Sequence, residues 1–311
     1  MNILIITGGS SSERKISLLS ASMVKKALIS NGHAVQVFDF KRGYSELRSA
    51  IKVCDVAFPV MHGREGEDGT LYRFLKSSKI PYVGSEPKGA KIAFDKILFK
   101  QYCDRNSIVT APWKIVKTKQ DIIKFGFPCV LKATYGGSSH EVVILHKLKD
   151  LSGFLVKKIL QLPCRVYAEK QLIGVEITVG VLNGKALPVV EIVPPNGKWF
   201  DYKSKYSGMA KEIPFAPSVD VGVQKKAQAI SLKIHKDLQL GSYSRADFIL
   251  QDGVLYILEI NTPCGVGLTS ESLLPKAAKA AGITFELLAQ KLLPKNISSH
   301  VRYHGDIHNQ R

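Results

Sequence analysis

The chain has 311 residues, 45% of them hydrophobic, which is enough to bury a sizeable core and to form two or three lobes. No run approaches the roughly 20 apolar residues of a membrane span, and the start lacks the features of a secretion signal, so we expect a cytoplasmic protein without membrane contact. The formal charge of +18 is concentrated in residues 91–175, which hold 15 basic and 6 acidic residues and suit a compact polyanion as well as a nucleic acid. Nucleic acid is the less favoured partner, because the chain has neither an RNA-binding aromatic signature nor a zinc-finger spacing.

The first 83 residues alternate between strand-like and helix-like segments. The expected strands are 2–7, 34–40 and 56–60, and the expected helices are 16–30 and 44–51. This βαβ alternation predicts a parallel sheet. Two prolines and two glycines in 80–89 mark a boundary, and we assign residues 1–86 to an N-terminal domain.

The glycine-serine stretch TGGSSSERKIS follows the first expected strand. It matches neither the dinucleotide-binding pattern nor the P-loop pattern. Ser10 and Glu13 have the spacing of a helix capping box, so the local sequence leaves two interpretations open, a helix cap or a substrate-binding loop.

Residues 87–172 form a second predicted unit, a smaller α+β lobe. Helical spacing covers 90–106 and 149–160, and the short apolar runs around the second helix predict strands at 113–118, 127–133, 141–146 and 165–172.

Residues 173–311 are predicted to form a third lobe built on two hairpins. Asn183-Gly184 and Asp252-Gly253 are the expected turns, and a helix is expected over 223–238. The chain is therefore α/β, with an α+β central lobe. His300, His304 and His308 lie four residues apart in the C-terminal tail, for which we expect a solvated segment and not a metal site.

The second hairpin of the third lobe carries oxygen ligands in otherwise apolar strands. Glu259 and Asn261 are two residues apart and share a face, and Asp247 lies across the turn within reach of them. Such a set of oxygens is suited to Mg²⁺. Arg245 stands on the same face and can stabilise a negative oxygen during a reaction, or can simply pair with a neighbour.

Two further loops have the composition of ligand-binding segments. KATYGGSSHE contains Lys132 and a glycine-serine turn that can cradle phosphate, and Lys96 belongs to the same basic lobe. The polar and aromatic loop FDYKSKY is where a lid is expected.

Taken together, these segments resemble the D-alanine:D-alanine ligase family of ATP-grasp enzymes over nearly the whole chain. The resemblance rests on the order of GGSSSERKISLLS, HGREGEDG, IPYVGS, FDK, LKATYGGSS, AEKQLIGVEITVGVL, LPVVEI, FDYKSKY, RADF, EINT and SLLPKAA. It implies an ATP-grasp fold of three lobes with an N-terminal parallel sheet. It also implies ATP-dependent joining of two D-alanines through an acyl phosphate, for peptidoglycan synthesis, by a homodimer.

The resemblance also implies roles for individual residues. Glu13 would receive the ammonium of the first D-alanine in a group with Ser138 and Tyr206, and His62 would face the carboxylate of that substrate. Arg245 and the Gly265 amide would stabilise the oxyanion, while Ser272 and Leu273 would contact the second D-alanine. The implied ATP contacts are Lys96, Lys132 and Lys205 at the phosphates and Glu169, Lys170, Leu172 and Glu176 at adenine and ribose. Asp247, Glu259 and Asn261 would bind two Mg²⁺ ions, with Mn²⁺ as a second candidate.

Three segments depart from the family pattern. His140 and Glu141 follow the serine loop where the family has small residues, TPCGVGLTSE is two residues longer than usual, and Tyr72-Arg73 replaces a Gln-Gly pair. Because the longer loop would line the second substrate site, an ATP-grasp ligase with another acceptor, such as D-lactate, D-serine or a different amino acid, is the alternative function.

Overall fold

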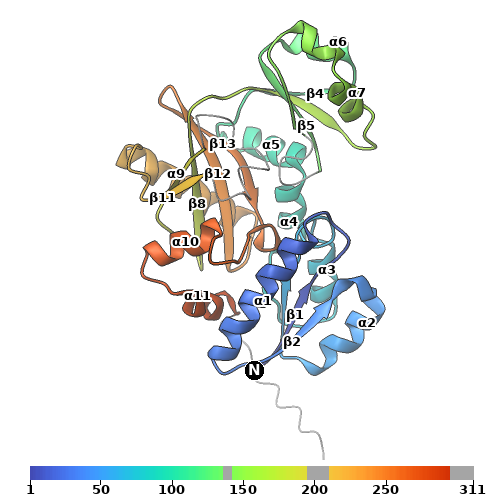
Figure 1. The fold of residues 1–311 in the computed structure, drawn as a ribbon, viewed down its shortest axis with the longest axis vertical. Coiled ribbons are helices and arrows are strands. Elements are labelled where there is room, and N and C mark those ends of the chain that lie inside the picture. Colours follow the sequence, from blue (N-terminus) through green and yellow to red (C-terminus); the bar gives the residue numbers. More distant parts are fainter. Residues whose placement is uncertain (136–141, 195–209, 295–311) are drawn as a thin grey trace, which may run out of the picture.

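The computed structural model describes residues 1–135, 142–194 and 210–294 of the chain. Three sheets follow one another along the sequence, as Figure 1 shows. The sheets fall at 2–60, 113–170 and 175–261, in the same order as the three predicted lobes. None of the helices in these described ranges is long and apolar enough to cross a membrane.

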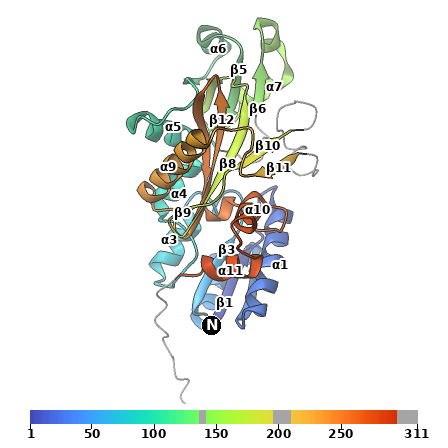
Figure 2. The ribbon, with the colours of Figure 1, turned by 90° about the vertical axis from the view of Figure 1, so that its left-hand side faces the viewer.

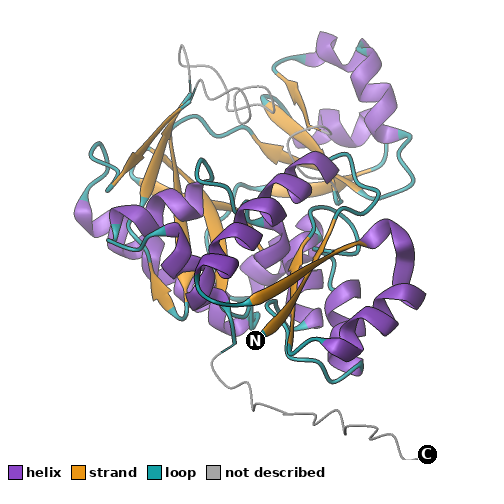
Figure 3. Cartoon of the chain, turned by 60° about the horizontal axis from the view of Figure 1, so that its bottom comes forward, coloured by secondary structure: helices purple, strands orange, loops and turns teal. Residues whose placement is uncertain are grey.

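The N-terminal sheet is parallel, as predicted, with strand order β2-β1-β3. Its strands are β1 (Asn2–Thr7), β2 (Ala34–Asp39) and β3 (Val56–Val60), and its helical segments are α1 (Arg14–Ser30), η1 (Phe40–Arg42), α2 (Gly43–Ala50), η2 (Ile51–Val53) and α3 (Thr70–Ser77). Residues 3–6 of β1 are all apolar and buried, because both faces of the strand are covered there. Ile3 and Ile5 pack in the cluster that includes α1, whereas Leu4 and Ile6 pack in the cluster that includes α2 and α3. Figure 3 shows helices on both sides of these strands.

Of the two interpretations left open for Ser10 and Glu13, the helix cap is wrong. The residue before the helix is Glu13, and no side chain caps the helix there. The serine loop is engaged elsewhere, because the Ser11 hydroxyl donates to the His62 carbonyl (2.8 Å) and accepts from the Glu13 amide (3.3 Å). The loop therefore joins the ends of β1 and β3.

The helix predicted over 90–106 is interrupted at Asp95. It consists of α4 (Pro87–Phe94) and α5 (Lys96–Arg105), and the Asp95 carboxylate accepts hydrogen bonds from the amides of Ile97 and Leu98, both at 3.0 Å. An aspartate that caps a new helix starts a new helix axis, which places Lys96 at its first turn.

The central sheet is antiparallel with order β4-β7-β5-β6. Its elements are β4 (Trp113–Val116), α6 (Lys119–Phe125), β5 (Cys129–Ala133), β6 (Val142–Leu145), η3 (Leu148–Ser152), α7 (Phe154–Leu160) and β7 (Val166–Lys170). The helix predicted over 149–160 is thus a 3₁₀ turn and a short α-helix, separated by Gly153 in an extended conformation.

The C-terminal sheet is antiparallel with order β11-β10-β8-β12-β13. Its elements are β8 (Val175–Leu182), β9 (Lys185–Ala186), β10 (Val190–Val193), β11 (Lys211–Pro214), α9 (Val221–Asp237), β12 (Tyr243–Gln251), β13 (Val254–Asn261), η5 (Pro263–Gly265), α10 (Leu273–Ala280) and α11 (Phe285–Leu292). Both predicted turns are found, with Asn183 and Asp252 each at a φ of 50°.

Two hydrophobic clusters join elements of different lobes. One joins β1, β3 and α1 to α10 and α11, and another joins α5 to the C-terminal sheet and α9. Figure 2 shows the resulting stack, with the central lobe at one end and the N-terminal sheet at the other. The carboxyl ends of β1 and β3 consequently meet the segment that follows β13, since β3 contacts η5.

Candidate active site

Glu13 and His62, the two described residues predicted to bind the first substrate, lie at the carboxyl ends of β1 and β3. Both are buried, and Ser17 links them, because its hydroxyl donates to the Glu13 carbonyl (3.3 Å) and accepts from the His62 amide (3.0 Å). The His62 Nε2 atom is buried and makes no hydrogen bond within the described ranges. It is therefore available to a ligand carboxylate.

The charge state of His62 follows from its surroundings. Burial lowers its pKa, the Glu13 carboxylate opposes this effect, and the Arg245 guanidinium lowers the pKa further. Arg245 lies on β12 of the C-terminal sheet. Its effect on His62 therefore shows that Glu13 and His62 lie near the hairpin of β12 and β13, which carries the predicted metal ligands.

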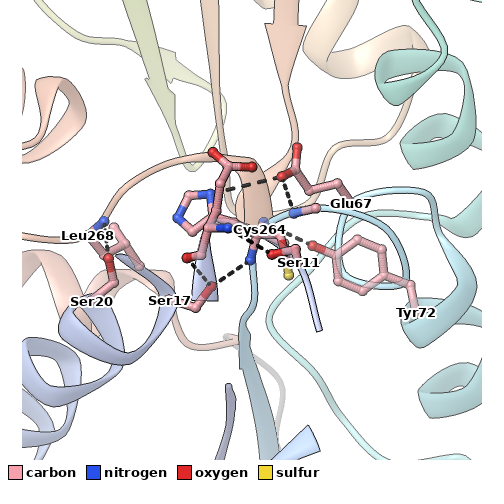
Figure 4. A network of polar contacts seen from close by, with 10 residues as sticks. Ser11, Ser17, Ser20, Glu67, Tyr72, Cys264 and Leu268 are labelled. Atoms are coloured by element: carbon pink, nitrogen blue, oxygen red, sulfur yellow. Dashed lines mark hydrogen bonds and ion pairs between the residues drawn. The ribbon is translucent and has the colours of Figure 1, made fainter. Parts of the chain in front are cut away.

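Glu67 is a site residue that sequence reasoning did not single out, although it lies within the quoted segment HGREGEDG. Its carboxylate accepts from the Gly63 amide at 2.7 Å and lies 3.9 Å from the His62 Nδ1 atom, within the network of polar contacts in Figure 4. Burial and the Glu13 charge raise its pKa to about 8; the Gly63 amide and Lys96 of the second lobe oppose this shift, and Glu259 of the third lobe adds to it.

The predicted carboxylates of the third lobe lie side by side. Asp247 faces Glu259 across β12 and β13, and Arg245 faces Asn261. Asp247 is nearly fully buried and accepts from the Thr178 hydroxyl (2.5 Å) and the Asn261 amide (3.1 Å). Arg245 donates to both Asp247 oxygens, at 2.9 and 2.8 Å. The predicted proximity of these residues is confirmed.

This set fits Mg²⁺ in its chemistry. Asp247 and Glu259 supply carboxylate oxygens, and Asn261 turns its amide nitrogen to Asp247, which leaves its oxygen for a ligand. Within the described ranges, no group of three His, Cys, Asp or Glu side chains could hold a metal ion. Since Mg²⁺ is commonly held by one or two carboxylates together with phosphate oxygens of a substrate, the set suits an ion bound with a triphosphate.

Lys132 and Glu169 form the centre of a buried charge cluster. Lys132 on β5 lies 2.6 Å from Glu169 on β7, and Lys100 on α5 lies 2.6 Å from the other Glu169 oxygen. Burial raises the pKa of Glu169, but the Lys132 and Lys100 ammonium groups outweigh it and hold the pKa at about 2. Burial lowers the pKa of Lys132, but Glu169, Glu259 and Glu176 together raise it above its ordinary value. Lys100 is a second residue that the sequence did not single out.

The remaining predicted contacts with ATP surround this cluster. Lys96 lies 3.8 Å from Glu259, Lys170 lies 5.5 Å over the Phe125 ring, and Leu172 is buried beside Ala111. Glu176 lies on β8 opposite Ile249 of β12.

The loop after β13 is attached to the N-terminal domain at two points. The Cys264 amide donates to the buried Tyr72 hydroxyl (3.2 Å), and the Leu268 amide donates to the Ser20 hydroxyl (3.3 Å), as Figure 4 shows. Two of the departures from the family pattern, Tyr72 and the longer loop, are thus in contact with each other.

Gly265 lies in this loop against Glu67. A Cβ atom there would stand 2.4 Å from the Glu67 carboxylate, so only glycine fits without movement. The Gly265 amide donates to the Thr262 carbonyl at 2.8 Å, which means that its predicted role as an oxyanion donor requires this turn to open.

Ser272 and Leu273 stand at the start of α10. The Ser272 hydroxyl accepts from the Thr269 amide at 3.1 Å and so closes the loop that precedes the helix. Ser138, Lys205 and Tyr206 lie outside the described residues, as do His140, Glu141 and the three histidines of the tail.

Comparison with known proteins identifies the family of the chain. Two family models match, "D-ala D-ala ligase C-terminus" over residues 105–294 and "D-ala D-ala ligase N-terminus" over residues 42–85. The chain is 36% identical over 301 residues to a D-alanine–D-alanine ligase of Maridesulfovibrio salexigens, covering 94% of this chain and 97% of the relative. It is 38% identical over 292 residues to the ligase of Aquifex aeolicus, covering 93% and 98%.

Solved structures show the same fold. The Bacillus anthracis D-alanine–D-alanine ligase complexed with ATP superposes with a TM-score of 0.81 at 29% identity, over 94% of this chain and 96% of that one. D-alanyl-alanine synthetase A of Vibrio cholerae superposes with a TM-score of 0.82 at 26% identity, over 94% and 97%. The expected ATP-grasp fold is confirmed, and the chain belongs to the D-alanine:D-alanine ligase family.

Proposed function

We propose that the chain joins two D-alanine molecules into D-alanyl-D-alanine at the expense of ATP, and so makes a peptidoglycan precursor in the cytoplasm. Family membership supports the reaction. The observation that carries the proposal for this site is the convergence of charges from three lobes, since Glu13, Lys96 and Glu259 all act on Glu67. This convergence supports a site in which the residues proposed to bind the amino acid, the phosphates and the metal ion lie close together.

The first step is transfer of a phosphoryl group. A carboxylate oxygen of the first D-alanine attacks the γ-phosphorus of ATP, the bond to the β-phosphate oxygen breaks, and ADP leaves. Glu13 and His62 hold the ammonium and carboxylate of this substrate, while Lys96 and Lys132 offset the charge of the transferring group. Mg²⁺ held by Asp247, Glu259 and Asn261 would neutralise phosphate charge when it is bound.

The second step forms the peptide bond. The amine of the second D-alanine attacks the carbonyl of the acyl phosphate, inorganic phosphate leaves, and the nitrogen loses a proton. In this proposal Arg245 stabilises the oxyanion, and removing one such donor typically costs about 3 to 4 kcal/mol of barrier. Ser272, Leu273 and the loop fixed by Tyr72 would shape the site of this second substrate. We also propose a homodimer, which light scattering of the purified chain tests.

The decisive assay measures ADP release from ATP and Mg²⁺. D-alanine alone is compared with L-alanine, with D-alanine plus D-lactate, and with no amino acid, and the products are identified by mass spectrometry. We expect release that depends on D-alanine and yields the dipeptide. Depsipeptide formed from D-lactate in preference to the dipeptide would favour the alternative acceptor, and the absence of any D-alanine dependence in folded protein would refute the proposal.

A pair of variants tests the amino-acid site. Glu13→Gln removes the buried charge expected to bind the ammonium and should raise the KM for D-alanine at least about tenfold, the loss expected when a charged hydrogen-bond partner is removed. Glu46→Gln changes an exposed glutamate of α2 that pairs with Arg42, and it should leave that KM unchanged.

A further inference from the structure

Lys100 is an almost completely buried lysine, only 1% exposed, and the reaction as described gives it no role. Its ammonium lies 2.6 Å from Glu169 and 2.5 Å from the Thr110 hydroxyl. Thr110 in turn donates to the carbonyl of Ile257 on β13 at 3.0 Å. Lys100 therefore connects the central sheet to the strand that carries Glu259 and Asn261.

The charge balance around Lys100 is unusual for a structural ion pair. A buried lysine requires a counter-charge, and Glu169 supplies one. Glu169, however, already has Lys132 at 2.6 Å on its other oxygen. One carboxylate thus lies between two ammonium groups, and the three residues together carry a charge of +1. A pair that served stability alone would need only one lysine.

The arrangement assigns the two lysines different tasks. Lys100 is enclosed and is anchored through Thr110, whereas the Lys132 side chain is 13% exposed. We infer that Lys100 is a positioning residue that neutralises Glu169, so that Lys132 keeps a full positive charge for the phosphates of bound nucleotide. This inference rests on the proposed function, in which Lys132 contacts ATP.

The inference predicts an order of affinities set by charge. The trio carries +1 in the wild type, zero in Lys100→Met, +2 in Glu169→Gln and +1 again in the double variant. The affinity for the phosphate groups of the nucleotide should increase with the net positive charge of these three residues. Contacts with adenine and ribose cancel when the affinity for a non-hydrolysable ATP analogue is divided by the affinity for adenosine in the same variant.

Calorimetric titration of the full chain measures both affinities at constant Mg²⁺ and ionic strength. We expect Lys100→Met to lower the ratio about tenfold, which is the effect of one positive charge on an anion at a separation of about 10 Å and an effective dielectric constant of about 20. Glu169→Gln should raise the ratio, and the double variant should restore it to near the wild-type value. Lys233→Met serves as the control, because Lys233 pairs with Asp237 on the outside of α9, and it should leave the ratio unchanged.

The outcomes separate this inference from its premise. If the wild-type chain does not bind the analogue, the proposed function fails and the inference fails with it. If the wild type binds the analogue, two results for Lys100→Met would leave the proposed function standing and overturn the inference. Either the affinities for adenosine and for the analogue fall by the same factor, or neither affinity falls. If Lys100→Met does not fold, Glu169→Gln and the double variant decide, because a ratio that does not fall when Lys100 is replaced in the Glu169→Gln background contradicts the charge count.

Discussion

Asp95 stands at the break between α4 and α5, and we expect its replacement by alanine to be among the most destabilising changes in the central region. Its carboxylate accepts from two α5 amides, from the Thr134 hydroxyl at 2.5 Å and from Arg165 at 2.9 Å. The side chain is 2% exposed, whereas Arg165 is 46% exposed. The contributions therefore differ in size.

The magnitude follows from these contacts. Loss of a helix cap costs about 1 kcal/mol. Leaving the buried Thr134 hydroxyl without its acceptor costs about 1 to 3 kcal/mol. The exposed side of the Arg165 pair adds less than about 1 kcal/mol. We expect Asp95→Ala to lower the free energy of unfolding by about 3 kcal/mol.

Urea unfolding followed by Trp113 fluorescence measures this loss, in a Trp199→Phe background that leaves Trp113 on β4 as the sole tryptophan. Asp121→Ala is the matched control, because Asp121 belongs to an exposed capping box at α6 and should cost about 1 kcal/mol. A loss for Asp95→Ala no larger than that of the control would refute the argument that the Thr134 and Arg165 contacts add to the cap.

Three further predictions concern the site. Glu67 has a folded-state pKa of about 8 against an ordinary value of 4.5, so the free energy of unfolding should fall as pH rises between these values. Glu67→Gln should remove that loss, so in urea unfolding its stability relative to the wild type should increase by up to about 1.4 kcal/mol per pH unit. A difference in stability between the two proteins that does not change with pH would contradict this prediction. Tyr72→Phe leaves the Cys264 amide without its acceptor, so it should lower the free energy of unfolding by about 1 to 3 kcal/mol and raise the KM for the second D-alanine. If neither value changes, the contact is incidental. Because the pKa of His62 is lowered, binding of the D-alanine carboxylate should take up a proton near neutral pH, which calorimetry in buffers of different ionisation enthalpy detects; His62→Gln should lack this uptake.

Most of the strands, and the parallel N-terminal sheet, could be predicted from local pattern, whereas β11 (Lys211–Pro214) was not expected. Alternating and continuous apolar runs identify β1, β12 and β13, and the Asn-Gly and Asp-Gly turns identify the hairpins. The proximity of Asp247, Glu259 and Asn261 could also be predicted from their spacing in the sequence, because a hairpin turn fixes which residues face one another.

What could not be predicted depends on contacts between distant segments. Ser10 and Glu13 have capping-box spacing, but the neighbouring Ser11 is bound to the β3 end, which no local pattern reveals. Asp95 ends a helix whose apolar spacing continues past it. Glu67 and Lys100 were overlooked because their partners, Gly265 and Glu169, lie far along the chain.

The three fully buried cysteines can report, through labelling of their thiols, the order in which parts of the molecule unfold. Cys103 lies in the core of the C-terminal sheet, Cys129 in that of the central lobe, and Cys264 beside Tyr72, where the loop after β13 meets the N-terminal domain. Burial raises the pKa of each thiol, to about 12 for Cys103 and Cys264, so alkylating reagents reach them only after local opening. The order in which the native thiols are labelled in rising denaturant therefore reports the order in which the two cores and this junction open, without any engineered probe.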